Sequence, residues 1–292
     1  MAEKVYRGFD ADELTTQYSP SLTVSDAPQQ IQHWQESSHR FRENVASNAV
    51  YDIAYGGSIG ERMDIFGTNT SDAPVHVYIH GGYWQRTDKT DYSYLAEKLV
   101  ADGAVVVVPN YNLCPAVGIE DIVEEMRRLL TWVFRNIAQY GGDPEQIHIS
   151  GHSAGGHLTA MMALTDWNSL NSDLPPNLVK SGVSISGVFE LEPLIHTPIN
   201  EPLHLDRQSA KALSPLFMTA DHVPPLSFAV GGEESSEFKR QSEAMLSHWQ
   251  SLGGETNNFL CPNRNHFTVI GDIADTDSQL YAEIAGHLFV QH

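Results

Sequence analysis

The stretch Ile147–Leu158, IHISGHSAGGHL, decides the fold that we predict for this chain. Its first three residues favour a buried strand, and the apolar residues from Leu158 to Leu164 have helical spacing. Between them lies Gly151-His152-Ser153-Ala154-Gly155, a G-x-S-x-G pattern. In so sharp a strand-to-helix turn, side chains two residues on either side of the serine would collide, so glycine stands at both positions. The pattern predicts that Ser153 projects above a sheet at the start of a helix.

The serine pattern alone also fits an ordinary turn in which a serine caps a helix. A second motif upstream favours a catalytic role for Ser153 over this capping role. His80-Gly81-Gly82-Tyr83-Trp84 follows a short apolar strand that we predict at Val75–His80. Acyl transfer by a serine requires a base, an acid that orients the base, and N–H donors for the oxyanion. The two motifs together predict that Ser153 is a nucleophile.

Backbone N–H groups close to the serine are the expected oxyanion donors. One belongs to Ala154, directly after the serine, and the others belong to Gly82 and Tyr83 in the upstream motif. Consecutive glycines there let the main chain approach a substrate. The alternative for this motif is a plain turn.

The base is expected to follow the nucleophile and the acid in chain order. Four histidines lie after the strand that should carry the acid: His248, His266, His287 and His292. Of these, His266 alone lies in a loop just after a predicted strand, Asn257–Leu260. We therefore predict that His266 is the base, and its alternative is a surface-loop histidine.

The acid has two main candidates. Glu233 and Glu234 both follow a strand predicted at Leu226–Val230, and the one that is not the acid would be a solvated carboxylate. Asp206 is a third candidate, but it falls in an insertion and not at a strand end.

Three further residues are candidates for substrate contact. Trp84 ends the upstream motif, where its indole would either wall an aromatic substrate or pack in the core. Tyr111 and Asn112 follow the valine run Ala104–Pro109, at the carboxyl end of the predicted sheet, where α/β sites form. We expect Trp84, Tyr111 and Asn112 to contact the substrate.

Strands and helices alternate from residue 75 onward, which predicts an α/β fold with a mostly parallel, doubly wound sheet. We expect one domain over residues 1–292, with an N-terminal arm at 1–49. Residues 187–225 are rich in proline and too long for a plain connection, so we predict a small cap over the site.

The chain is strongly acidic. Its 292 residues include 17 Lys and Arg against 37 Asp and Glu, a formal net charge of −20. This argues against nucleic-acid partners and anionic membrane surfaces. It also disfavours acidic substrates mildly, although a local pocket can override the global field. We expect a small-molecule substrate, and a homodimer is compatible with the sequence.

The sequence gives no sign of a cofactor or a secretion signal. His148, His152 and His157 lack a carboxylate at ligand spacing, so we expect no metal and no cofactor. The two cysteines, Cys114 and Cys261, suggest free thiols in a reducing compartment. The polar N-terminus and the absence of a long apolar run predict a soluble, cytoplasmic protein.

The two glycine motifs resemble the kynurenine formamidase (arylformamidase) branch of the α/β-hydrolases. That branch is similar to hormone-sensitive-lipase-like esterases, which have His-Gly-Gly-Gly where this chain has His80-Gly81-Gly82-Tyr83. Leu14–Pro20, LTTQYSP, resembles the family's N-terminal arm, and Glu237–Ser242 resembles the helix after its acid. The family's acid is commonly an aspartate at the position of Glu234, so the resemblance favours Glu234 over Glu233 and implies an α/β-hydrolase fold.

The resemblance implies hydrolysis of an N-formyl aryl amide such as N-formylkynurenine through an acyl-enzyme, without metal or cofactor. Two alternatives stay open at this point. The same machinery would serve a carboxylesterase acting on short acyl esters. The fold could also be kept by a binding module without catalysis, although the candidate nucleophile, base and acid argue against that.

Overall fold

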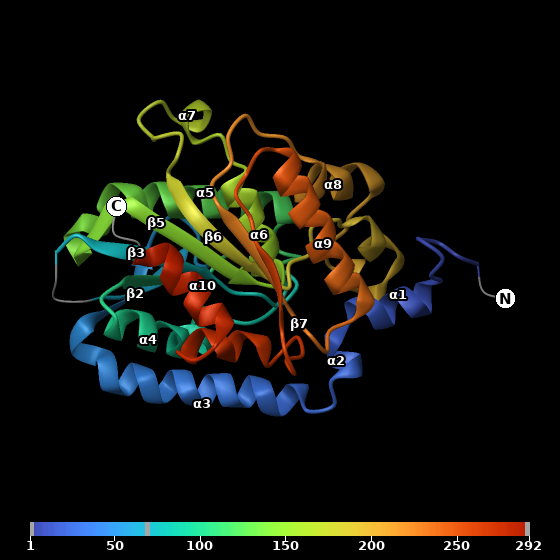
Figure 1. Ribbon diagram of the computed structural model, residues 1–292, viewed down its shortest axis with the longest axis horizontal. Helices are drawn as coiled ribbons and strands as arrows, with labels where there is room; N and C mark the ends of the chain where they lie inside the picture. Colours follow the sequence, from blue (N-terminus) through green and yellow to red (C-terminus); the bar gives the residue numbers. More distant parts are fainter. Residues whose placement is uncertain (1–2, 68–70, 290–292) are drawn as a thin grey trace.

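Figure 1 shows the computed structural model, which describes residues 3–67 and 71–289. Within these residues, eight strands form one sheet in the order β1-β2-β4-β3-β5-β6-β7-β8. The strands are β1 Ala49–Ala54, β2 Arg62–Phe66, β3 Ala73–Ile79, β4 Val105–Pro109, β5 Gly142–His152, β6 Val179–Ile185, β7 Leu226–Gly231 and β8 Asn258–Cys261.

The sheet is antiparallel at one edge and parallel elsewhere. Strand β2 pairs antiparallel with β1 and with β4, and all other neighbours, from β4 across to β8, are parallel. This confirms the predicted α/β fold with a mostly parallel, doubly wound sheet. The parallel strands end at a common edge, so the loops that follow β3, β5, β7 and β8 converge there.

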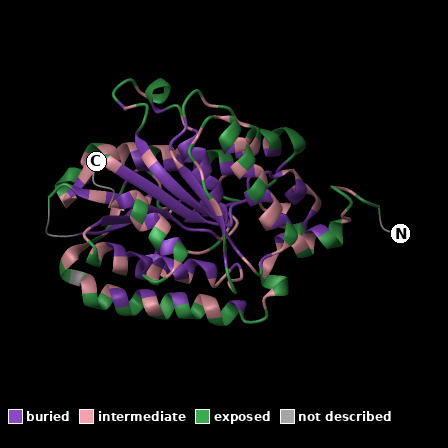
Figure 2. Ribbon diagram, in the orientation of Figure 1, coloured by how far each residue is buried: buried purple, intermediate pink, exposed green. Residues whose placement is uncertain are grey.

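Strand β4 shows why the central sheet is covered on both faces. Its residues are all buried, and successive side chains of a strand point to opposite faces. Val105 and Val107 belong to one buried cluster, whereas Val106 and Val108 belong to the other. Figure 2 shows the strands as the most continuously buried part of the chain, with exposed residues on the outer faces of the helices.

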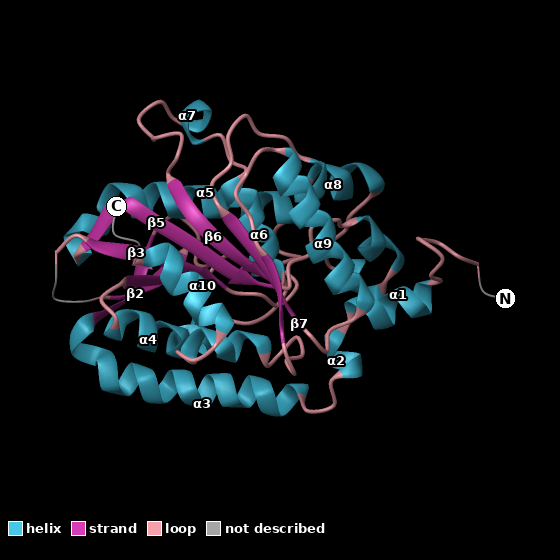
Figure 3. Cartoon of the chain, viewed as in Figure 1, coloured by secondary structure: helices cyan, strands magenta, loops and turns pink. Residues whose placement is uncertain are grey.

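Helices cover both faces of the sheet (Figures 1 and 3). The cluster around Val105 contains residues of α5 and α6, and the cluster around Val106 contains residues of α3, α4 and α10. The helices are α1 Ala11–Tyr18, α2 Pro20–Thr23, α3 Ala27–Val45, α4 Ala96–Ala101, α5 Ile119–Asn136, α6 Ala154–Ala163, α7 Trp167–Leu170, α8 Arg207–Ala212, α9 Ser236–Ser251 and α10 Gln279–Leu288.

The long helix α3 explains how the N-terminal arm is held. Trp34, Ser38 and Phe41 are its buried residues near the middle, at the spacing of one helix face. The Trp34 ring packs 5.6 Å from that of Tyr92 in the 3₁₀ helix η2, Lys89–Leu95. The arm therefore lies against the segment that follows the His80–Trp84 motif.

Residues 187–225 fold as short pieces. They contain the 3₁₀ helices η4 Glu192–His196, η5 Pro198–Asn200 and η6 Pro215–Phe217, together with α8. Among the residues the structure describes, no helix is long and apolar enough to cross a membrane.

Candidate active site

The turn after β5 carries Ser153 in a strained conformation. Its backbone has φ 58° and ψ −118°, a left-handed value that costs energy for a residue with a Cβ. A Cβ on Gly151 would lie 2.3 Å from the carbonyl oxygen of Gly155, and one on Gly155 would lie 2.0 Å from that of Ile79. Both glycines are therefore required by close backbone contacts, as the sequence pattern predicted.

Glu234 and His266 meet at the carboxyl edge of the sheet. Glu234 Oε2 lies 2.6 Å from His266 Nδ1, and both side chains are buried. The second carboxylate oxygen, Oε1, accepts hydrogen bonds from the Ser186 hydroxyl at 2.5 Å and from the Gly231 N–H at 2.8 Å. The carboxylate is thus fixed on one side and directed at the imidazole on the other.

The other acid candidates lie elsewhere. Glu233 is exposed to solvent. The carboxylate of Asp206 accepts a hydrogen bond from the Ser209 N–H at 2.7 Å and caps α8.

The other histidine candidates do not reach the site either. Nε2 of His248 lies 2.8 Å from the Met218 carbonyl oxygen, and His287 lies near Glu283 on α10. His292 falls outside the described residues.

The turn after β3 presents backbone donors. Gly82, Tyr83 and Trp84 all have positive φ, at 98°, 53° and 59°. No described residue accepts a hydrogen bond from the N–H of Gly82 or Tyr83, and Ala154 is the first residue of α6, whose N–H has no preceding turn to bond. These three predicted donors are therefore available to a ligand.

A cavity of about 220 Å³ joins the turn, Ser153 and His266. Its other lining residues come mainly from the N-terminal arm and from aromatic side chains. The lining comprises Ser19, Pro20, Ser21, Ala27, Pro28, Ile31, Trp34, Gly82, Tyr83, Arg86, Thr87, Tyr92, His152, Ser153, Ile199, His266 and Phe267. Ser153 and His266 face one space, and no hydrogen bond joins their side chains in the described part of the chain.

The predicted substrate contacts need correction. Trp84, Tyr111 and Asn112 do not line the cavity. Trp84 is fully buried and packs edge-on against His157, with ring centroids 5.0 Å apart.

The side chains of Tyr111 and Asn112 are engaged in hydrogen bonds within the protein. The Tyr111 hydroxyl donates to the carbonyls of His80 and Gly81, at 2.9 and 3.2 Å, beneath the oxyanion turn. The Asn112 amide donates to Glu125 at 2.7 Å, under α5. We therefore withdraw all three as substrate contacts.

The arm residues of the cavity were missed in the sequence. Seven lining residues lie between Ser19 and Trp34, and Ile199 is the contribution from residues 187–225. The spacing of Ile31 and Trp34 on one helix face was the available signal. It indicates an apolar face, but it does not say against what that face packs.

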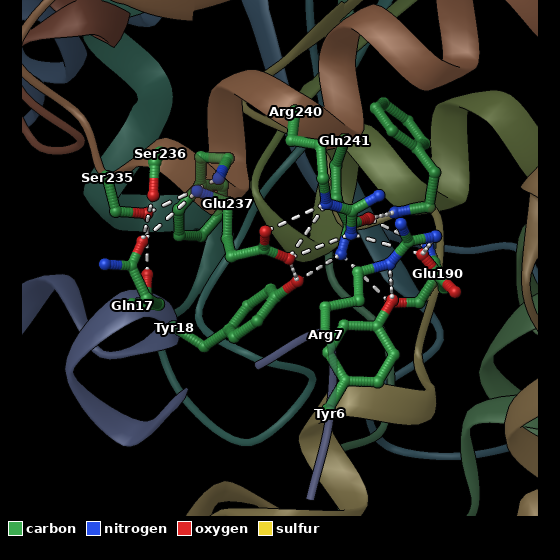
Figure 4. A network of polar contacts seen from close by, with 12 residues as sticks. Tyr6, Arg7, Gln17, Tyr18, Glu190, Ser235, Ser236, Glu237, Arg240 and Gln241 are labelled. Carbon is green, nitrogen blue, oxygen red and sulfur yellow. Dashed lines mark hydrogen bonds and ion pairs between the residues drawn. The ribbon is translucent and has the colours of Figure 1, made fainter. Parts of the chain in front are cut away.

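A buried polar network fastens the arm beside the acid (Figure 4). The Tyr18 hydroxyl donates to Glu237 at 2.7 Å and accepts from the Gln241 amide at 2.8 Å. Ser235, next to Glu234, donates from its hydroxyl to the Gln17 carbonyl at 2.7 Å. The arm is therefore tied to the start of α9.

The same network reaches the insertion. Arg240 Nε donates to the Glu237 carboxylate at 2.9 Å, and its Nη2 donates to Glu190 at 3.1 Å. Glu190 also lies 3.8 Å from Arg7 of the arm. Three segments far apart in the sequence thus meet on one cluster of charges.

Burial governs the ionisation of the histidine beside the base. The ring of His152 lies 4.5 Å from that of His266. Burial, followed by the charge of His266, holds the pKa of His152 well below its usual range. His152 therefore stays neutral near neutral pH. No group of three or more His, Cys, Asp or Glu side chains in the described ranges is arranged to hold a metal ion.

Comparison with known proteins gives consistent relatives. The BD-FAE family model matches residues 63–248. Kynurenine formamidase of Danio rerio is 31% identical over 92% of this chain and 94% of its own length, and that of Salmo salar is 30% identical over 94% and 95%. Esterase LipQ of Mycobacterium tuberculosis is 28% identical over 66% of this chain and 50% of its own.

Solved structures show the same fold. A putative thioesterase from Silicibacter sp. TM1040 superimposes with a TM-score of 0.82, at 29% identity, over 94% of this chain and 99% of its own. A hyperthermophilic esterase from Pyrobaculum calidifontis gives a TM-score of 0.72 at 21% identity, over 89% and 93%.

Proposed function

The chain belongs to the kynurenine formamidase family of α/β-hydrolases, and on that premise we propose that it hydrolyses N-formyl aryl amides such as N-formylkynurenine to formate and the aromatic amine. One observation carries the chemistry. Ser153 and His266 line one cavity, and Glu234 lies 2.6 Å from the far nitrogen of His266.

The first half of the reaction forms a formyl-enzyme. Ser153 Oγ attacks the formyl carbon while His266 Nε2 takes the hydroxyl proton, and Glu234 stabilises the resulting imidazolium. The N–H groups of Gly82, Tyr83 and Ala154 hold the oxyanion, each contributing on the order of 10²–10³ in rate. The C–N bond then breaks, and the amine leaves with the proton from His266.

The second half consumes water. His266, neutral again, takes a proton from a water molecule that attacks the formyl ester on Ser153. The C–O bond to Ser153 breaks, the proton returns to Ser153 Oγ, and formate is released.

The cavity walls support an aromatic leaving group. The Trp34 ring lies 5.6 Å from that of Tyr92 and stacks on that of Phe267 at 6.0 Å. All three rings line the cavity with Ile31. Such a wall favours a planar apolar ring.

An ester or thioester hydrolase is the second candidate, because esterases and a putative thioesterase share this fold. Steady-state kinetics on N-formylkynurenine, p-nitrophenyl acetate and an acetyl thioester separate the two. A kcat/KM at least about tenfold higher for the formamide supports our proposal, since a tenfold preference needs only about 1.4 kcal/mol. Cleavage of the ester or thioester without the formamide would contradict it.

We further propose that the substrate is a small molecule, with neither nucleic acid nor a membrane as partner, and that the chain acts in the cytoplasm. The net charge of −20 and the two free, buried cysteines support this. A homodimer stays a prediction, which light scattering on the purified protein tests.

A further inference from the structure

The residues that line the cavity include Arg86 and, among those that the structure describes, no aspartate or glutamate. The buried Glu234 carboxylate lies behind this lining, 2.6 Å from His266 Nδ1. The lining contrasts with the whole chain, in which acidic residues outnumber basic ones by 37 to 17. A field of that sign repels anions, whereas the exposed Arg86 at the cavity is a local cationic group that can attract one.

We propose that Arg86 binds a carboxylate carried by the aromatic amine portion of the substrate and thereby selects aryl formamides that bear a carboxylate over those that lack one. This inference rests on the proposed function and adds a specificity-determining residue to it. The aromatic walls take the ring, and Arg86 takes the acidic group that the ring carries.

The backbone fixes Arg86 relative to the reacting carbonyl. The Arg86 N–H donates to the Gly82 carbonyl at 3.1 Å. A Cβ on Gly82 would lie 2.3 Å from the carbonyl oxygen of Arg86, so the two residues are in close backbone contact. The Thr87 hydroxyl donates to the Gly81 carbonyl at 3.1 Å. The segment that presents the oxyanion donors therefore also carries Arg86, so their separation is set by one tight turn.

The side chain of Arg86 is available. It is exposed, and none of the described residues forms a hydrogen bond or an ion pair with its guanidinium. Other arginines are engaged: Arg42 lies 2.6 Å from Asp64, and Arg240 lies 2.9 Å from Glu237. A ligand carboxylate would meet a guanidinium that need not first leave a protein partner.

Guanidinium chemistry suits this task. Its planar fork binds a carboxylate through two parallel N–H donors, and such charge-assisted hydrogen bonds are stronger than neutral ones. For a substrate with an α-amino-acid side chain, the carboxylate would lie on Arg86. The ammonium would face water, since no described acidic side chain lines the cavity to receive it.

The test compares two formamides that differ in the acidic group. 4-(2-Formamidophenyl)-4-oxobutanoate carries the carboxylate without an ammonium, and 2′-formamidoacetophenone has the same aryl formamide and ketone without the carboxylate. We expect Arg86→Gln to lower the ratio of their kcat/KM values about 10- to 100-fold, mainly through the KM of the anion. Arg86→Lys should give an intermediate ratio. Arg135→Gln, on α5 away from the cavity, is the matched control and should leave the ratio unchanged.

Ionic strength gives an independent readout. The wild-type ratio should fall as salt rises from about 0.01 to 0.5 M, because Arg86 is exposed and screened, and the ratio for Arg86→Gln should not. An unchanged ratio of the two kcat/KM values in Arg86→Gln, whether or not both values fall, overturns this inference and leaves the proposed function standing. A wild-type protein that cleaves neither formamide while cleaving the ester overturns both.

Discussion

Glu234 holds His266 with one carboxylate oxygen, 2.6 Å from Nδ1, and uses the other to accept from Ser186 and Gly231. Each oxygen therefore has a separate task. This division explains how a glutamate, one methylene longer than the aspartate common in the family, can stay fixed in a buried position.

Glu234→Gln should abolish most activity, because an amide neither stabilises the imidazolium nor enforces the tautomer of His266. We expect kcat/KM to fall at least about 10³-fold. The neighbouring Glu233→Gln, at an exposed position, is the matched control and should stay within about twofold. The reverse order of losses would show that Glu233 is the acid.

Ser186 is a positioning residue for the acid. Its backbone φ is 51°, so Ser186→Ala and Ser186→Gly remove the same hydroxyl while differing in backbone strain. Both variants should lose about tenfold in kcat/KM. Losing a donor makes the Glu234 carboxylate a stronger partner for the imidazolium, so the acidic limb of the pH profile should move upward in both. A limb that stays in place would mean a merely structural role.

The pH profile should report a single ionisation on its acidic side. The base must be neutral, so kcat/KM should rise with pH along one acidic limb. Burial keeps the pKa of His152 well below the usual range of an imidazole, so it adds no second proton. A log–log slope of one is expected, whereas a slope of two or a flat profile would contradict the assignment.

Buried histidines should make the fold acid-sensitive. Burial, followed by the charge of His148, lowers the pKa of His76 to about 3. The unfolded chain binds the proton near pH 6.5, so this stability is complete above that pH and is lost as the pH falls toward 3. At pH 5 the loss from His76 is about 2 kcal/mol.

Urea unfolding at pH 7 and pH 5 checks this stability prediction. The drop in unfolding free energy between the two pH values should be about 2 kcal/mol smaller in His76→Gln than in the wild type. His33→Gln, at an exposed position on α3, is the control and should leave the drop unchanged. Equal drops in His76→Gln and the wild type would show that His76 is not held neutral by burial.

Tyr18→Phe tests the fastening of the arm. The substitution leaves Glu237 and Gln241 each without one buried hydrogen-bond partner, which should cost about 1–3 kcal/mol of unfolding free energy. Because the arm lines the cavity, KM for N-formylkynurenine should rise more than kcat falls. Loss of stability without any change in KM would show that the arm does not position the cavity wall.

The sequence predicts the strand-to-helix turn around Ser153 well, because the demand on Gly151 and Gly155 is steric and local. The sequence also predicts that the catalytic candidates after the parallel strands lie close together, since parallel strands end at one edge of the sheet. Its prediction of Trp84, Tyr111 and Asn112 as substrate contacts was wrong, because chain position after a strand does not say whether a side chain faces the cavity or the core. The arm residues could not be placed, because Trp34 meets Tyr92 and Phe267 only in the tertiary fold.

The most direct test of the account is formate release from N-formylkynurenine by the wild type and by Ser153→Ala, with melting temperatures measured alongside. We predict rapid release by the wild type and a loss of at least about 10⁴-fold in the variant, at an unchanged melting temperature. Formate release at an undiminished rate by well-folded Ser153→Ala would contradict the central claim that Ser153 is the nucleophile of a formamide hydrolase.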